Sequence, residues 1–293
     1  MRLAFVGLPL AALLLAADGH DVAWAGVCRK DALGTRRLRR VVRRVEIVPD
    51  LAAHVDEVRA LEVDLVVSWF WTRKVPRAFR ELGRHGAIGV HPSLLPRWRG
   101  PDPYYWAIAA GDAETGVTAH TLEDEYDTGD LLGHAALDID PSWDAWALAR
   151  ALDRPSLRLL RRIVRAYADG DGPVARAQDD ARVTMAPAPT DDDLELRWGA
   201  WTSDEVERRV RAAAPWPGAF TTIGDETLVL TRVRPTDDYP RALAPGEACV
   251  RDGVAIVRTA DGAVELLAGR LEDDDEALDR DALAACVDVT LVG

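Results

Sequence analysis

The sequence predicts an α/β protein in which a doubly wound parallel sheet is followed by a small β-barrel domain. Three observations indicate this architecture. Short, nearly continuous apolar runs alternate with helical patterns through the first half of the chain, as expected for parallel strands that are buried on both faces. A Gly- and Pro-rich segment at 169–193 resembles a linker. Beyond it, short alternating strands separated by Gly and Asp turns are typical of a small barrel.

The first half alternates strands and helices from the first residues onward. Strands are predicted at 2–7, 21–27, 45–48, 64–70, 87–90 and 116–120, with helices at 9–18, 49–61, 76–82 and 104–110. Right-handed β-α-β connections would order the first strands into one parallel sheet. Gly7-Leu8-Pro9 lacks the Gly-x-Gly-x-x-Gly pattern, so it does not indicate a nicotinamide site. A long amphipathic helix is predicted at 142–167, with a break or kink at Pro155.

The second half is predicted to be mostly β. A strand at 194–198 and a capped helix that begins near Ser203 precede a series of short strands. These strands are expected at 219–223, 227–233, 246–251, 255–258, 263–267 and 287–291. Because many short strands with turn residues between them can close on themselves, an OB-like barrel is the expected fold.

Composition limits the function classes. The 293 residues have a net charge of −13, which disfavours a protein whose surface is dominated by nucleic-acid contacts. The apolar runs are too short or too interrupted to cross a membrane, and the N-terminus is interpreted as strand-turn-helix rather than as a signal peptide. The three widely spaced cysteines predict neither a metal site nor a disulfide framework, so a reducing cytoplasm is expected.

The most informative stretch runs from 86 to 133. His91 lies in a loop bounded by Pro92 and Pro96, and Asp127 begins an Asp-Thr-Gly turn about 36 residues later. A histidine and a carboxylate brought together in this way can move a proton to and from a reacting amine. From the spacing alone, a surface histidine beside an ordinary turn explains the pattern equally well.

This stretch resembles the signature of the folate-dependent formyltransferases. The matching positions are His91, Ser93-Leu94-Leu95-Pro96, Arg99-Gly100, Gly111-Asp112, Gly116-Val117-Thr118 and Asp127-Thr128-Gly129. Residues 211–219, with Pro215-Trp216-Pro217-Gly218, are similar to the C-terminal domain of the methionyl-tRNA formyltransferase-like members. The resemblance implies a Rossmann-like catalytic domain over 1–180 and an OB-like domain over 181–293.

The resemblance also implies an enzyme with 10-formyltetrahydrofolate as cosubstrate and with His91 and Asp127 as catalytic residues. It places folate binding on Trp71, Thr72, Arg73, Val75, Ser93 and Leu95, with no metal. For Trp71, ordinary core packing is an equal alternative. His120, on the strand that leads to Asp127, is interpreted as a structural histidine or as one that supports the site from behind.

One position departs from the family pattern. The family has a catalytic Asn two residues before the histidine, where this chain has Gly89. That Asn donates a hydrogen bond to the oxyanion, and loss of such a donor typically costs about 10²–10³ in rate. The departure leaves room for a substitute donor, for a less demanding acceptor, for 10-formyltetrahydrofolate hydrolysis, or for a degenerate module that binds folate without catalysis.

The charge pattern bears on the acceptor. Six arginines between 36 and 44 form either a solvated helix face or an anion clamp, and tRNA-formylating members have a basic loop in this region. From Leu196 to the end, 11 Arg and no Lys stand against 19 Asp plus Glu, a balance of 11 − 19 = −8. A polyanion-binding domain should be basic. The preferred acceptor is therefore a small-molecule amine, such as an amino sugar nucleotide or hydroxyornithine, and methionyl-tRNA is the alternative.

Overall fold

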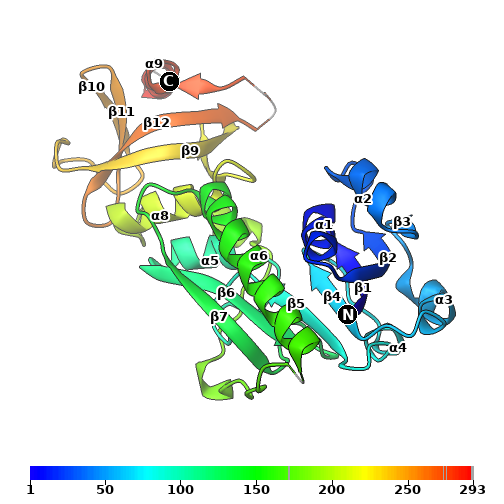
Figure 1. Ribbon diagram of the computed structural model, residues 1–293. Coiled ribbons are helices and arrows are strands. Elements are labelled where there is room, and N and C mark those ends of the chain that lie inside the picture. Colours follow the sequence, from blue (N-terminus) through cyan, green and yellow to red (C-terminus); the bar gives the residue numbers. More distant parts are fainter. Residues whose placement is uncertain (171, 273, 275, 292–293) are drawn as a thin grey trace. The chain divides into compact units, whose positions relative to one another are not determined.

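The computed structural model describes residues 1–170, 172–272, 274 and 276–291 (Figure 1). Two compact units emerge from its contacts. The first comprises 1–103, 114–138 and 151–187, and the second 104–113, 139–150 and 188–293. The predicted fold class is confirmed, because a parallel-dominated α/β unit is accompanied by a small antiparallel β unit. The predicted functional boundary after residue 180 stays a prediction.

The first unit is built on a seven-stranded sheet in the order β3-β2-β1-β4-β5-β6-β7. Its strands are β1 (Arg2–Gly7), β2 (Asp21–Val27), β3 (Val45–Ile47), β4 (Leu65–Trp69), β5 (Ala87–His91), β6 (Glu114–Thr121) and β7 (Leu131–Asp138). The first five run parallel. Strand β6 then pairs antiparallel with β5, and β7 pairs antiparallel with β6. The predicted strands here are confirmed, whereas β7 was not foreseen.

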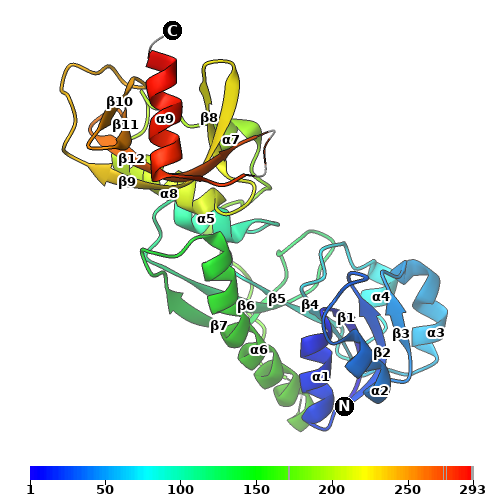
Figure 2. The same cartoon turned by 90° about the horizontal axis from the view of Figure 1, so that it is seen from above.

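Helices cover both faces of this sheet. They are α1 (Pro9–Ala17), α2 (Thr35–Val41), the 3₁₀ turn η1 (Leu51–His54), α3 (Val55–Arg59), α4 (Arg77–Arg80) and much of α6 (Ala145–Asp169). On one face α1 and α6 lie together (Figure 2), joined by a bidentate pair in which Arg161 donates to Asp18 at 2.5 and 2.6 Å. On the other face Trp24 and Phe79 are fully buried in an apolar cluster. The sheet is therefore enclosed on both sides, as a parallel sheet requires.

Helix α6 runs through Pro155 without interruption, so the predicted break at this proline does not occur. Next to the proline, the Ser156 hydroxyl accepts a 2.7 Å hydrogen bond from the indole N–H of Trp69. Buried apolar side chains on either side, such as Leu152 and Leu159, keep the helix on the sheet. Packing therefore outweighs the hydrogen bond that proline removes.

The second unit holds an antiparallel sheet in the order β10-β11-β12-β9-β8, with β13 paired to β12. The strands are β8 (Ala219–Ile223), β9 (Glu226–Thr236), β10 (Ala248–Arg251), β11 (Val254–Arg258), β12 (Ala263–Leu271) and β13 (Leu278–Asp279). The helices are α5 (Pro103–Ala109), α7 (Asp191–Leu194), α8 (Ser203–Ala213) and α9 (Arg280–Leu291), and the 3₁₀ turn η2 (Asp180–Arg182) belongs to the first unit. The predicted helix start is confirmed at Thr202, whose hydroxyl accepts from the backbone N–H of Glu205.

Two strand predictions in this unit are wrong. At 194–198, the Asp193 carboxylate accepts from the backbone and hydroxyl of Thr190 and starts the short helix α7, so only an isolated bridge to Phe220 remains. At 287–291 the chain continues α9 instead. Asp279 caps this helix by accepting from the backbone N–H groups of 281 and 282, and the alanines that follow favour helix. None of the described helices combines the length and apolar character that a membrane crossing needs.

Candidate active site

His91 is the last residue of β5, and the loop that follows holds its ring in place. Its side chain is 7% exposed, and its Nε2 lies 2.7 Å from the carbonyl oxygen of Trp98. The loop is closed by the Ser93 hydroxyl, which donates to the carbonyl of Arg97 at 2.6 Å. The Thr118 hydroxyl on β6 donates to the carbonyl of Ser93 at 2.7 Å. Neighbouring backbone and hydroxyl groups therefore orient the imidazole without help from a ligand.

Asp127 is presented by a turn that contains one left-handed residue and one closely packed glycine. Asp127 itself has φ +58°, a left-handed conformation that Asp tolerates better than most residues. A Cβ at Gly129 would lie 1.8 Å from the carbonyl oxygen of Thr121, so only glycine fits there. The Oδ2 atom of Asp127 accepts from the backbone N–H of Gly100 at 3.0 Å. The turn therefore aims one carboxylate oxygen at a backbone donor and leaves the other for the histidines.

Gln178 clamps this turn from a distant part of the chain. Its amide nitrogen donates to the carbonyls of Asp127 and Gly129, both at 2.7 Å. Its amide oxygen accepts from the nearly buried Arg99 guanidinium at 3.0 and 2.8 Å. Gln178 is the only glutamine of the chain, which is a signal that sequence reasoning missed. It joins the arginine of the Arg-Gly motif to the Asp-Thr-Gly turn.

Two imidazoles face the remaining oxygen of Asp127. The Nδ1 atom of His91 lies 3.4 Å from Asp127 Oδ1, and the Nε2 atom of His120 lies 3.6 Å from the same oxygen. Burial lowers the pKa of His120, although the Asp127 carboxylate opposes this shift. The structure brings the two predicted catalytic residues together and adds His120, which the sequence suggested as either a structural histidine or one that supports the site.

Gly89 lies directly opposite His120 in the β5–β6 ladder. A Cβ at position 89 would lie 2.9 Å from Leu122 Cδ2 and 3.8 Å from His120 Nε2. The family's Asn would therefore project beside the His120 ring, and the end of the Leu122 side chain would have to move. The chain contains no asparagine anywhere, so no other asparagine supplies the missing amide.

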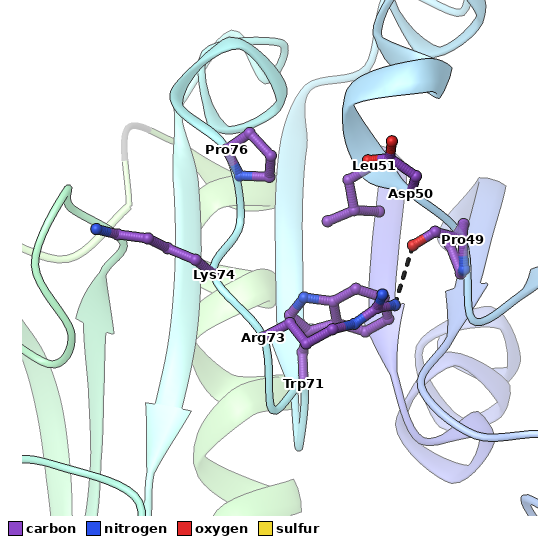
Figure 3. Close-up of a pocket in the computed structure, with 7 residues that line it drawn as sticks. All are labelled: Pro49, Asp50, Leu51, Trp71, Arg73, Lys74 and Pro76. Carbon is purple, nitrogen blue, oxygen red and sulfur yellow. Dashed lines mark hydrogen bonds between the residues drawn. The ribbon is translucent and has the colours of Figure 1, made fainter.

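The residues predicted to bind folate form two groups. Trp71 and Arg73 line a cavity of about 80 Å³ together with Pro49, Asp50, Leu51, Lys74 and Pro76 (Figure 3). The Arg73 guanidinium stacks 4.5 Å above the Trp71 ring and donates to the carbonyl of Pro49 at 2.9 Å. The buried Trp71 indole N–H has no hydrogen-bond partner among the described residues. It is a donor that a ligand could satisfy.

The other predicted folate contacts lie elsewhere. Thr72 is exposed beside the cavity, whereas the Val75 side chain is packed in the apolar cluster on the same face of the sheet. Ser93 and Leu95 are buried in the His91 loop, where the Leu95 N–H donates to the Thr118 hydroxyl at 3.0 Å. Their role in folate binding stays a prediction.

The basic segment predicted at 36–44 lies on helix α2 and just after it. The helix buries Leu38 and leaves all six arginines exposed, namely Arg36, Arg37, Arg39, Arg40, Arg43 and Arg44. Arg44 pairs with Glu46 and Glu57, and within the described part of the chain it is the one member of the six with an ion pair. The α2 arginines therefore present uncompensated positive charge to solvent.

Fold and site together define a class of protein. A buried histidine–carboxylate pair lies at the carboxyl end of a parallel strand, where open α/β sheets bind their ligands, and it is equipped to move protons. No group of three or more His, Cys, Asp or Glu side chains in the described ranges is arranged to hold a metal ion. The class is that of α/β proteins with a buried histidine–carboxylate pair suited to acid–base chemistry.

Comparisons with known proteins identify the group that is transferred. Residues 46–164 match the formyl transferase family, and 190–282 match the formyl transferase C-terminal domain. A methionyl-tRNA formyltransferase from Anaeromyxobacter sp. strain K is 37% identical, over 93% of this chain and 92% of its own length. The chain therefore belongs to the formyl transferase family, and it is a formyl-transfer enzyme.

Two solved structures share the fold. HypX from Aquifex aeolicus, in complex with tetrahydrofolic acid, is 20% identical with a TM-score of 0.67, and it matches 97% of this chain. This chain spans slightly less than half (46%) of HypX. An N-formyltransferase from Helicobacter canadensis, in complex with folinic acid and dTDP-3-aminofucose, has a TM-score of 0.67 at 14% identity, over 91% of this chain and 98% of its own.

Proposed function

We propose that this chain transfers the formyl group of 10-formyltetrahydrofolate to the amine of methionyl-tRNA. The observation that carries the reaction is the preassembled His91–Asp127 pair, within hydrogen-bonding reach of each other after a small movement. The acceptor is supported by the methionyl-tRNA formyltransferase that matches 93% of this chain at 37% identity. The sequence alone favours a small-molecule amine as the acceptor and gives methionyl-tRNA as the alternative. The proposal exchanges these two acceptors.

The site can perform both proton movements that formyl transfer requires. The acceptor nitrogen bonds to the formyl carbon as the bond from that carbon to N10 of the folate breaks. The amine gives up one proton and N10 gains one. In this proposal His91 and Asp127, whose facing atoms lie 3.4 Å apart, give one proton to N10 and take up the proton that the amine releases. The buried environment strengthens each of these electrostatic interactions.

Folate binding is proposed for the segment that includes Trp71 and Arg73, with the His91 loop. The unpartnered indole N–H of Trp71 and the exposed side chain of Thr72 fit a ligand rich in acceptors. Replacement of Trp71 by Phe removes that donor and keeps the stacking surface for Arg73. We expect the Kd for 5-formyltetrahydrofolate to rise about five- to ten-fold, as for loss of one hydrogen bond, in a fluorescence titration. An unchanged Kd would remove Trp71 from the folate site.

The tRNA is proposed to contact the α2 arginines. Phosphate contacts give binding that weakens steeply with salt, with a slope that reports the number of contacts. A variant with alanine at Arg36, Arg37, Arg39 and Arg40 should raise KM for methionyl-tRNA about ten-fold or more and flatten the salt dependence. Alanine at Arg154 and Arg158, two exposed arginines of α6, is the matched control and should leave KM unchanged.

A small-molecule amine remains a second candidate because of the charge of the second half. Residues 196–293 carry 11 Arg against 19 Asp plus Glu, a balance of 11 − 19 = −8, which is unfavourable for a polyanion. The N-formyltransferase from Helicobacter canadensis shares the fold over nearly its whole length. This candidate predicts that the four-arginine variant keeps full activity toward its true acceptor.

The deciding experiment measures release of tetrahydrofolate from 10-formyltetrahydrofolate with separate acceptors. The panel contains methionyl-tRNA, nucleotide amino sugars and hydroxyornithine. Stimulation by methionyl-tRNA alone supports the proposal. Stimulation by a small amine selects the second candidate. Release without any acceptor indicates hydrolysis, and bound folate without release indicates a binding module, so both outcomes contradict the proposal.

A further inference from the structure

The hydrogen bonds of the two site histidines determine where their protons lie. His91 Nε2 is 2.7 Å from the carbonyl oxygen of Trp98, and His120 Nδ1 is 2.8 Å from the carbonyl oxygen of Thr121. A carbonyl oxygen only accepts hydrogen bonds, so both ring nitrogens must carry hydrogen. When both rings are neutral, His91 Nδ1 and His120 Nε2 therefore carry no hydrogen and are bare.

Both bare nitrogens face the same atom, Asp127 Oδ1, at 3.4 and 3.6 Å. Three lone-pair-bearing atoms then converge with no proton between them, while the other carboxylate oxygen is held by the Gly100 N–H. Addition of one proton converts a repulsive contact into a charge-assisted hydrogen bond. The arrangement therefore favours uptake of one proton by the three side chains together.

A second proton at His120 is disfavoured by its burial and by two of the three groups that face it. Its ring is 4% exposed, and the charged and titratable groups around it are Asp127, His91 and Arg99. Burial is the largest influence and lowers the pKa of His120, and His91 and Arg99 act in the same direction. Asp127 acts in the opposite direction. Asp127 Oδ1 is therefore the one point at which a proton can contact all three side chains.

His120 also lies beside the position where the family has its Asn and this chain has Gly89. The two residues are cross-strand partners on one face of the sheet, and His120 Nε2 lies 3.8 Å from the Cβ position of residue 89. The chain has no asparagine, and its single glutamine is engaged with Arg99 and with the turn carbonyls. His120 is therefore the polar side chain beside the vacant position.

We propose that His120 is a positioning residue that shares one proton with His91 and Asp127 beside the glycine at position 89. This proposal rests on the proposed formyl transfer. As the bond from the formyl carbon to N10 breaks, the shared proton passes to N10, and the proton released by the acceptor amine replaces it. No proton is gained or lost over the cycle. His120 acts through Asp127, which it holds opposite His91.

The first test does not depend on activity. Nitrogen-15 NMR of the full chain, with the imidazoles of its six histidines assigned by substitution, follows ring protonation against pH. We expect the His91 and His120 rings to respond in one common step, and Asp127→Asn to move that step down by about one pH unit or more. If His120 Nε2 stays bare and unresponsive while His91 takes up its proton, the proposal is wrong.

The second test is kinetic. His120→Asn and His120→Gln should each lower kcat about ten-fold or more, as for loss of acid–base support, with KM for folate and acceptor within two-fold. The basic limb of the kcat–pH profile should move to lower pH, because the proton is held less tightly. His134→Asn is the control, since His134 is an exposed histidine one strand further along the same sheet.

The outcomes separate the two proposals. A purely structural role for His120 predicts that glutamine restores activity and that the pH profile does not move, which overturns the proposal. If the two rings titrate in a common step but the chain transfers no formyl group, the shared proton is supported and the proposed function is refuted. If the chain transfers formyl groups but the two rings titrate independently, the proposed function is supported and the proposed role of His120 is refuted.

Discussion

The clamp formed by Gln178 gives the sharpest prediction about how this site is held together. Leucine at this position has nearly the same size but removes four hydrogen bonds, two to the Arg99 guanidinium and two to the carbonyls of Asp127 and Gly129. Bonds to a charged group contribute about 1.5–3 kcal/mol, and the loss is less than additive, so we expect roughly 2–3 kcal/mol of destabilisation.

This loss should be visible in both stability and rate. For a unit of this size it corresponds to a fall in Tm of about 4–12 °C, measured by thermal denaturation. Because the carbonyls of Asp127 and Gly129 each lose the hydrogen bond that Gln178 donates, kcat should fall about 10²-fold, as for a misplacement near 1 Å. Gln178→Glu keeps the acceptor for Arg99 and loses both donors. It should therefore lose as much activity with a smaller change in Tm.

The control lies two residues earlier in the same segment. Arg176 has an exposed side chain, and its backbone pairs with Leu131 whatever that side chain is. Arg176→Leu should change neither Tm nor kcat appreciably. If Gln178→Leu behaves like this control in both measurements, the clamp does not hold the turn and the reasoning from its hydrogen bonds is refuted.

Three further predictions concern the catalytic pair, the turn and the helix contact. His91→Ala and Asp127→Asn should each lower tetrahydrofolate release at least about 10²-fold with circular dichroism unchanged, and near-normal rates in both would remove the proposed mechanism. Gly129→Ala forces a Cβ to 1.8 Å from a backbone carbonyl, so the chain should unfold at lower temperature and lose activity, and an unchanged Tm would contradict this contact. The Arg161 hydrogen bond lowers the pKa of Asp18 below its ordinary 3.8, so the pair stabilises the fold above that value and the contribution is lost as pH falls through the lowered pKa. Arg161→Leu should cost about 0.2–1 kcal/mol in urea unfolding at pH 7 and nothing in strong acid, and a pH-independent cost would show that packing is responsible.

Local sequence patterns were sufficient for most of the first unit. Parallel strands buried on both faces produce continuous apolar runs, so 2–7, 21–27 and 64–70 were recognisable without any knowledge of their neighbours. The pattern failed where local signals conflicted. The β-branched residues near the C-terminus favoured a strand, but the cap at Asp279 and the alanines after it start helix α9.

The site residues likewise include some that a local motif predicts and others that only the structure brings together. His91 and Asp127 could be predicted because a motif with ordered spacing carries them, and the absence of the family's Asn at Gly89 could be read directly. The contact between His120 and Asp127 could not be predicted from the sequence. His120 meets Asp127 only because β6 pairs antiparallel to β5, which sets it opposite Gly89.

The sequence by itself determined the family, the fold class and the two residues expected to move protons, since each depends on patterns within a short stretch of chain. Tertiary structure alone decided that Gln178 reaches Asp127 across 51 positions and that two imidazoles converge on one carboxylate oxygen. Hydrogen bonds depend on distances of about 3 Å between atoms. Separation along the chain does not encode such distances until strand pairing and loop closure bring the side chains together.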